Sequence, residues 1–238
     1  MSNNYFQFKQ FRIKQEKTAM KVGTDGVLLG AFTDFSRAER ILDVGAGTGL
    51  IALMAAQRNQ LAEIVAVEKD KQAFEQMKDN FCRNEIGVGI SPVLTDFTEF
   101  AAQTLEQFDC IVSNPPYFNS SNPPKGQSRL LARHNASLSY EALILGAVKL
   151  MPETGHLSVI LPSDHLEQFN RFCLKSKLHL KRFWQVKPTP GKPPKRVMLT
   201  YTLTKEILEE KTIVIESGGR HIYSPEYVEL TQDFYMNM

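Results

Sequence analysis

Short apolar segments alternate with amphipathic segments through the middle of the chain. Continuous apolar runs that stop at glycine, proline or polar residues are typical of buried strands. Such runs occupy residues 40–44, 63–68, 91–95, 108–114 and 156–162. The intervening segments with helical composition are residues 50–58, 70–84, 139–151 and 164–176. This alternation predicts an α/β fold with a mostly parallel sheet and helices on both of its faces.

The pattern changes after residue 176. Residues 178–186 and 197–203 have the composition of strands, and a loop rich in proline, glycine and lysine joins them. We expect this late pair to be antiparallel, as in other mixed sheets. Residues 212–216 suggest one more strand and residues 224–238 a closing helix, whereas the first forty residues are irregular and basic.

The chain shows no internal repeat, so we expect a single domain over residues 1–238. This domain includes two special segments: residues 1–35, a basic N-terminal arm followed by a segment near the ligand site, and residues 187–196, a basic proline-rich loop. With 238 residues, of which 42% are hydrophobic, the chain can bury a core without a metal or a disulfide.

Charge is distributed unevenly, although the net charge is only +2. Residues 168–205 carry ten Lys or Arg and no Asp or Glu, and residues 1–21 carry five bases and one acid. Residues 22–167 carry 11 bases against 18 acids. Basic flanks of this kind fit a polyanionic partner, and a merely solvated surface is the equal alternative.

The cysteines and histidines argue against a metal site. The three cysteines, at positions 82, 110 and 173, are widely spaced, as in proteins of a reducing compartment. None of them, and none of the five histidines, has the spacing of a zinc ligand set. The first residues lack the apolar stretch of a secretory signal, and no apolar run is long enough to span a bilayer. We expect a cytoplasmic protein that binds neither a metal nor a membrane.

The segment LDVGAGTGL at residues 42–50 is the first motif with chemical content. Its strand ends near Asp43, and Gly45, Gly47 and Gly49 precede a helix. Glycines allow a tight turn and let backbone amides approach a ligand closely. The carboxyl ends of parallel strands form the ligand crevice of such folds, so these four residues are candidates for cofactor binding. A glycine-rich turn without a ligand is the alternative, because the spacing differs from the dinucleotide fingerprint.

Two carboxylates follow the next two strands. Glu68 stands at the end of residues 63–68, where an acid can accept hydrogen bonds from both hydroxyls of a ribose. Asp96 follows residues 91–95, where a carboxylate could accept from an adenine amino group. The alternatives are a charge near a helix N-terminus for Glu68 and an N-cap for Asp96, with Thr98 as a competing cap. Together with the glycine loop, the two acids predict a site shaped for a nucleoside.

The segment Asn114-Pro115-Pro116-Tyr117 ends the fourth strand and is the sharpest signal in the chain. An aromatic amine is a poor nucleophile because its lone pair is delocalised into the ring. The side-chain oxygen of Asn114 and the carbonyl of Pro115 could hold its two N–H bonds and stabilise the positive charge that develops during attack. Tyr117 could stack on an extruded base, while the prolines keep the pocket rigid. A rigid turn without chemistry is the alternative.

The motifs together resemble a known family. The glycine loop and the NPPY segment are similar to those of class I S-adenosylmethionine-dependent methyltransferases that modify amino groups. The chain resembles in particular the tRNA1(Val) adenine-37 N(6)-methyltransferase family. The segments that carry this resemblance are residues 20–30, 42–58, 112–118, 195–199 and 231–238.

The resemblance implies a Rossmann-like fold with a seven-stranded sheet and S-adenosylmethionine lying over the strand ends. It implies that Gly45, Gly47, Glu68 and Asp96 bind this cofactor. It assigns residues 114–117 to the target adenine, with Asn114 also next to the cofactor. The expected reaction is methyl transfer to the N(6) amine of an adenosine in the anticodon loop of tRNA, carried out by a monomer.

The resemblance also places Lys21, Thr24 and Asp25 beside the cofactor. The residues alone indicate a glycine turn in this segment, in which Thr24 or Asp25 caps the next helix.

Several basic residues are candidates for contact with RNA phosphates. They are Arg129 and Arg133 in the segment after the NPPY motif, and Lys192, Lys195 and Arg196 in the proline-rich loop. An exposed, solvated loop is the alternative in each case. Phe183 and Trp184 could stack on a base, although core aromatics in a strand explain them more simply.

Rival functions stay open at this point. One rival is a methyltransferase that acts on guanine amines of ribosomal RNA. In the sequence, only the resemblance of the segments that flank the motifs distinguishes the two functions. A release-factor glutamine methyltransferase usually needs a further N-terminal helical domain, and a DNA adenine methyltransferase usually carries a target-recognition insert. A non-catalytic RNA-binding subunit of the same fold is disfavoured by the intact glycine loop, Glu68 and Asn114.

Overall fold

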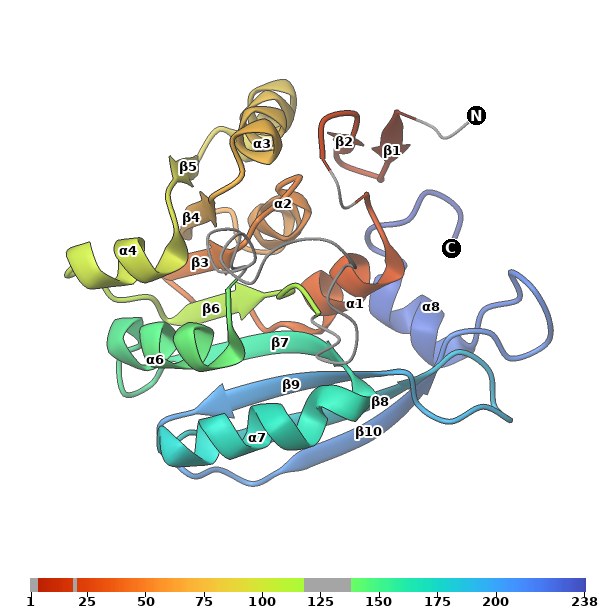
Figure 1. The fold of residues 1–238 in the computed structure, drawn as a ribbon. Coiled ribbons are helices and arrows are strands. Elements are labelled where there is room, and N and C mark those ends of the chain that lie inside the picture. The colour runs from red at the N-terminus through yellow and green to blue at the C-terminus, as the bar shows by residue number, and fades with distance from the viewer. Residues whose placement is uncertain (1–3, 19–20, 118–137) are drawn as a thin grey trace, which may run out of the picture.

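Figure 1 shows the fold in a computed structural model, which describes residues 4–18, 21–117 and 138–238. The main sheet has the strand order β10-β8-β9-β7-β6-β3-β4-β5. In chain order its strands are β3 (Arg40–Val44), β4 (Glu63–Glu68), β5 (Ile90–Leu94), β6 (Cys110–Ser113), β7 (His156–Pro162), β8 (His179–Lys187), β9 (Arg196–Thr202) and β10 (Glu209–Val214). Because β7, β6, β3, β4 and β5 are all parallel, their carboxyl ends meet at one edge of the sheet.

The late antiparallel pair is confirmed. Strand β9 is antiparallel to both of its neighbours, β7 and β8, and β10 lies parallel to β8 at the edge. The expected count of seven strands is wrong, because the described residues place eight strands in the main sheet. Strand β10 begins earlier than the predicted segment 212–216, since its first residues are charged and exposed and carry no apolar signal.

Helices pack on both faces of the sheet and create two apolar cores (Figure 1). Apolar residues of α1, α2, α3 and α8 belong to one core, and those of α4, α6 and α7 belong to the other. The bounds are α1 (Thr24–Phe32), α2 (Leu50–Arg58), α3 (Lys71–Arg83), α4 (Phe97–Gln103), α6 (Tyr140–Leu150), α7 (Leu166–Lys175) and α8 (Pro225–Thr231). The α/β layering predicted from the hydrophobic pattern is therefore confirmed.

The described part of the N-terminal arm contains regular structure, so the expectation of an irregular start is wrong. Strands β1 (Tyr5–Gln7) and β2 (Arg12–Lys14) form an antiparallel hairpin. We call residues 5–14 the N-terminal strap. Phe8 and Ile13 of the strap are fully buried, and Phe8 forms an isolated bridge with Tyr235 near the C-terminus. Phe8 and Ile13 therefore belong to the first core.

Trp184 also belongs to the core. Its side chain is only 8% exposed, packs edge-on against Phe32 and donates its indole N–H to Glu209 at 2.7 Å. The suggestion that Trp184 stacks on a base is therefore wrong. The closing helix α8 is shorter than the predicted span 224–238, and a turn follows it. Within the described ranges, no helix combines the length and apolar character that a membrane crossing requires.

Candidate active site

The glycine loop has the backbone that its sequence predicts. Gly45, Gly47 and Gly49 all have positive φ, at 73°, 57° and 80°, a region that L side chains rarely adopt. At Gly49 an added Cβ would also overlap the ring of Phe81. Gly49 is the N-cap of α2, so the loop and the helix start are built together.

Glu68 fixes the glycine loop to the end of β4. Its Oε2 accepts the N–H of Gly47 at 2.9 Å, and its Oε1 accepts the N–H groups of Lys69 and Asp70, both at 2.8 Å. The side chain is 9% exposed. A carboxylate has about four acceptor positions, so this geometry leaves one on Oε2 for a ligand hydroxyl. From the sequence, we expect Glu68 to accept hydrogen bonds from both hydroxyls of a ribose. That contact would require one of the three bound N–H groups to move away from the carboxylate.

Asp43 contacts the helix α2 that follows the glycine loop. Its side chain is buried and accepts the N–H of Ala52 in α2 at 3.1 Å, and it lines neither of the two cavities described below. Burial, with a smaller contribution from the charge of Glu68, raises the pKa of Asp43 to about 7, although the hydrogen bond from the Ala52 N–H lowers it. Because the ordinary pKa is 3.8, this carboxyl stabilises the fold less as the pH rises from about 4 to 7.

Asp96 caps a helix, which is one of the two roles that the sequence predicts for it. It is the N-cap of α4 and accepts from the backbone N–H and the hydroxyl of Thr98, at 2.8 and 2.6 Å. Partial burial alone would raise the pKa of Asp96, but the hydrogen bonds from Thr98 outweigh it and lower this pKa. Asp96 also lines a cavity, so one residue serves as cap and as candidate ligand contact.

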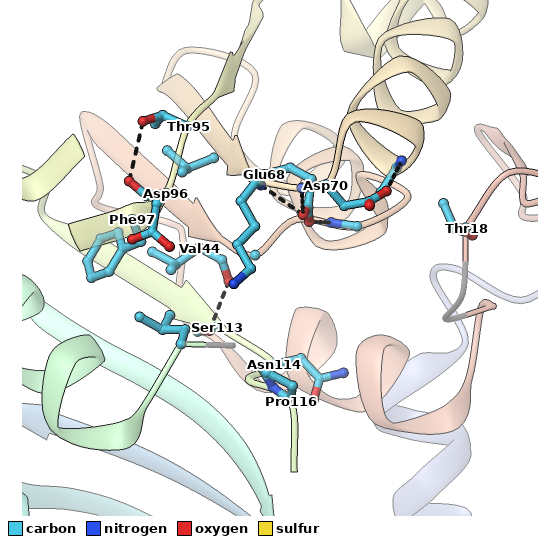
Figure 2. A pocket seen from close by; sticks show the side chains of 16 residues that line it. Thr18, Val44, Glu68, Asp70, Thr95, Asp96, Phe97, Ser113, Asn114 and Pro116 are labelled. Atoms are coloured by element: carbon cyan, nitrogen blue, oxygen red, sulfur yellow. Dashed lines mark hydrogen bonds between the residues drawn. The ribbon is translucent and has the colours of Figure 1, made fainter. Parts of the chain in front are cut away.

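Two cavities lie side by side at the carboxyl ends of the parallel strands. The first, of about 240 Å³, has Glu68 and Asp96 in its wall, together with the apolar side chains of Val67 and Phe97 (Figure 2). The second, of about 350 Å³, lies toward the start of α1. Both are lined by Gly45, Gly47 and Asn114. Asn114 therefore stands at their junction.

The structure brings most of the predicted cofactor residues together. The predicted residues that line the first cavity are Gly45, Gly47, Glu68, Asp96, Asn114 and Pro116, and those that line the second are Lys21, Thr24, Asp25, Gly45, Gly47, Asn114 and Tyr117. Gly49 and Pro115, like Asp43, line neither. Gly23 is the N-cap of α1 without a side-chain cap, so the expectation that Thr24 or Asp25 caps this helix is wrong.

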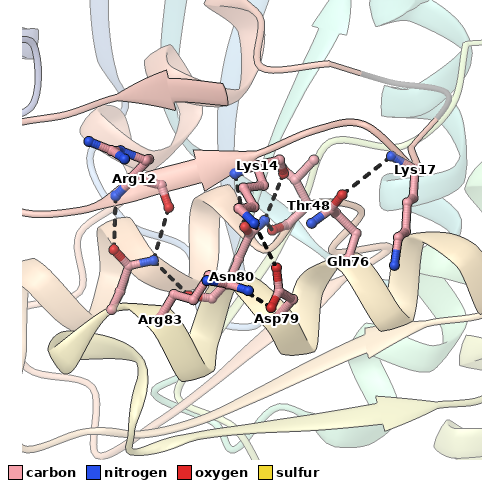
Figure 3. Close-up of polar contacts among 9 residues, drawn as sticks. Arg12, Lys14, Lys17, Thr48, Gln76, Asp79, Asn80 and Arg83 are labelled. Atoms are coloured by element: carbon pink, nitrogen blue, oxygen red, sulfur yellow. Dashed lines mark hydrogen bonds and ion pairs between the residues drawn. The ribbon is translucent and has the colours of Figure 1, made fainter. Parts of the chain in front are cut away.

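Thr18 and Leu138, which no sequence motif pointed to, line the first cavity from distant parts of the chain. Thr18 lies a few residues beyond the N-terminal strap, which is held in place by two amide side chains, one on α3 and one just beyond its end. Asn80 and Asn84 each pair with both backbone groups of one strap residue, Lys14 and Arg12 respectively, at 2.8–2.9 Å. A third amide, Gln76, accepts the N–H of Lys17 at 3.3 Å (Figure 3).

The NPPY segment leaves the end of β6 directly beside the glycine loop. Ser113, the last residue of β6, donates its hydroxyl to the carbonyl of Val44 at 2.9 Å. The hydroxyl of Tyr117 donates to Oδ1 of Asn114 at 2.6 Å. Burial, followed by the charge of Asp25, raises the pKa of the Tyr117 hydroxyl, so this group remains a donor at neutral pH.

The basic candidates divide into three groups. Lys192 and Lys195 are exposed on the loop between β8 and β9. Arg196 instead forms an ion pair with Asp25, with Nε 2.8 Å from Oδ2. Arg129 and Arg133 lie outside the described residues. Among the residues that are described, no group of three or more His, Cys, Asp or Glu side chains could hold a metal ion.

Comparison with solved structures shows the fold. A predicted O-methyltransferase from Agrobacterium tumefaciens superposes with a TM-score of 0.66, covering 88% of this chain and 96% of the other at 22% identity. The family model for the methyltransferase small domain matches residues 18–168. This match includes the glycine loop, Glu68, Asp96 and the NPPY segment.

Curated relatives match over the whole length. A protein of Bacteroides fragilis strain YCH46 named tRNA1(Val) (adenine(37)-N6)-methyltransferase is 43% identical, and the alignment covers 100% of both chains. A protein of Phocaeicola vulgatus with the same name is 44% identical, again over 100% of both chains. The chain therefore belongs to the tRNA1(Val) (adenine(37)-N6)-methyltransferase family.

Proposed function

We propose that the protein transfers a methyl group from S-adenosylmethionine to the N(6) amine of adenosine 37 in tRNA1(Val). The observation that carries this proposal is the position of Asn114 at the junction of the two cavities. The names of the full-length relatives support the choice of tRNA and of position. We further propose that it acts as a cytoplasmic monomer, as expected from the sequence.

The first cavity suits the adenosine part of the cofactor. Its carboxylates can accept hydroxyl and amino protons, and Val67 and Phe97 provide apolar walls for a flat ring. The second cavity then takes the amino-acid part, near Lys21 and the backbone of the glycine loop. When bound, the cofactor supplies an activated methyl group on a sulfonium.

The residues of the chain mainly position the target amine. Oδ1 of Asn114 and the carbonyl of Pro115 accept its two N–H bonds, which favours a tetrahedral nitrogen and stabilises the positive charge that develops on it. Tyr117 stacks on the base and keeps it in line for attack. The amine becomes acidic as it is methylated, so no strong general base is needed. Bases of an anticodon loop are single-stranded, so extrusion costs less than from a duplex.

The test is a methylation assay with tRNA1(Val) transcribed in vitro and isotope-labelled S-adenosylmethionine. We expect one labelled nucleoside, N(6)-methyladenosine, identified by mass spectrometry of the digested tRNA. The matched control is a transcript with guanosine at position 37, which should remain unlabelled. Label on guanosine, label on protein, or no label at all would refute the proposal.

Lys192 and Lys195 are proposed to contact the phosphates of the tRNA. Replacing both by glutamine should weaken tRNA binding about tenfold near physiological salt, because each lysine that neutralises a phosphate releases a counterion. The dependence of log Kd on log salt should flatten by about one unit for each phosphate that the variant no longer neutralises. Filter binding at several salt concentrations measures both quantities.

A matched control replaces Lys175 and Lys205, which are also exposed but lie near the opposite edge of the sheet, where the parallel strands begin. These substitutions remove the same charge and should leave the salt dependence unchanged. An equal effect of both pairs would mean that only the overall charge matters, and that the loop makes no specific contact.

A further inference from the structure

The acceptor assigned to the target amine already has a partner in the structure. The hydroxyl of Tyr117 donates to Oδ1 of Asn114 at 2.6 Å. An amide oxygen has two acceptor positions, and a close donor on one of them weakens the other. Asn114 must accept most strongly when positive charge develops on the amine. The reaction therefore benefits if the hydroxyl moves to another acceptor once the base arrives.

Asp25 is that other acceptor. Its Oδ2 lies 3.3 Å from the same Tyr117 hydroxyl. A carboxylate accepts more strongly than an amide oxygen, so a small rotation of the ring would exchange one hydrogen bond for a stronger one. Tyr117 is half-buried in the described structure, which limits the access of water as an alternative acceptor.

Arg196 holds the Asp25 carboxylate in this place. Its Nε donates to Oδ2 of Asp25 at 2.8 Å, and its Nη1 donates to the carbonyl of Lys195 at 3.0 Å. The guanidinium also lies 5.4 Å from the centre of the Tyr117 ring. A side chain from the start of β9 and one from the first turn of α1 thus meet at the catalytic tyrosine.

We propose that Asp25 is a positioning residue that takes over the Tyr117 hydroxyl when the target adenine reaches Asn114, with Arg196 fixing the carboxylate. This role rests on the proposed function. It differs from the cofactor contact that the family resemblance suggests for Asp25, because it acts through the Tyr117 hydroxyl.

A double-mutant cycle tests this role, using full-length wild-type protein, Asp25→Asn, Tyr117→Phe and the double variant. We expect Asp25→Asn to lower kcat on tRNA1(Val) about tenfold, because the hydroxyl then stays on Asn114. Its KM for tRNA should change less than about twofold. Because Asp25 also lines the second cavity, kcat is measured at saturating S-adenosylmethionine. Tyr117→Phe keeps the stacking ring and removes the hydroxyl, so Asp25→Asn should have almost no further effect in that background.

The suppression by Tyr117→Phe separates this role from a structural one. An equal loss of kcat in both backgrounds, measured at saturating S-adenosylmethionine, would overturn the proposal. Arg196→Gln provides a second variant if Asp25→Asn is unstable, with about a threefold loss of kcat that Tyr117→Phe again suppresses. Absence of tRNA methylation by the wild-type protein would instead refute the proposed function itself, and this proposal with it.

Discussion

Replacing Asn114 by alanine should lower kcat about 100- to 1000-fold, which is the usual cost of removing one preorganised group that stabilises transition-state charge. The substitution removes Oδ1, the acceptor that stands where the two cavities meet. Only the Pro115 carbonyl would then hold the amine. The affinity for S-adenosylmethionine should fall no more than a few-fold, because the side chain of Glu68 and the glycine loop remain.

Single-turnover methylation and calorimetric titration of the cofactor measure these two effects separately. Asn237→Ala is the matched control, because Asn237 is exposed and lines neither cavity. A loss of less than tenfold in the single-turnover rate would show that Asn114 does not hold the amine. A parallel loss of cofactor affinity would show that it acts mainly on the cofactor.

The parts of the site that lie on consecutive strand ends could be predicted from sequence. The strand predicted over residues 40–44 is β3 itself, and that over 63–68 is β4. Each of these strands is an apolar run that ends at a glycine or an acid, so the hydrophobic pattern locates the edge of the sheet. The parallel topology then brings Gly45, Glu68 and Asn114 to the same edge.

The parts that depend on distant contacts could not be predicted in this way. The ion pair between Asp25 and Arg196 joins residues 171 positions apart, and neither position shows a local signal for the other. The lysine-rich context of Arg196 favoured a phosphate contact instead. Likewise, the strap is held by the Asn80 and Asn84 amides, which resemble ordinary polar positions of an amphipathic helix in the sequence.

Replacing Glu68 by glutamine should weaken the binding of S-adenosylmethionine about 30- to 100-fold, as expected when hydrogen bonds to a charged group are lost. The carboxylate accepts three backbone N–H groups, and an amide nitrogen would turn a donor toward at least one of them. The glycine loop would then lose its fixed position and the remaining acceptor for a cofactor hydroxyl would change. Calorimetric titration measures the affinity.

The stability of Glu68→Gln should fall less than the lost hydrogen bonds alone suggest. The charge of Glu68 helps to raise the pKa of the buried Asp43, so its removal makes ionised Asp43 less costly. Glu63→Gln is the matched control at the other end of β4, where Glu63 is 74% exposed and pairs with Arg40. It should leave the cofactor affinity unchanged and cost little stability, because exposed ion pairs contribute about 0–1 kcal/mol. Equal affinities of wild-type protein and Glu68→Gln would mean that Glu68 only caps the neighbouring turn and has no part in holding the cofactor.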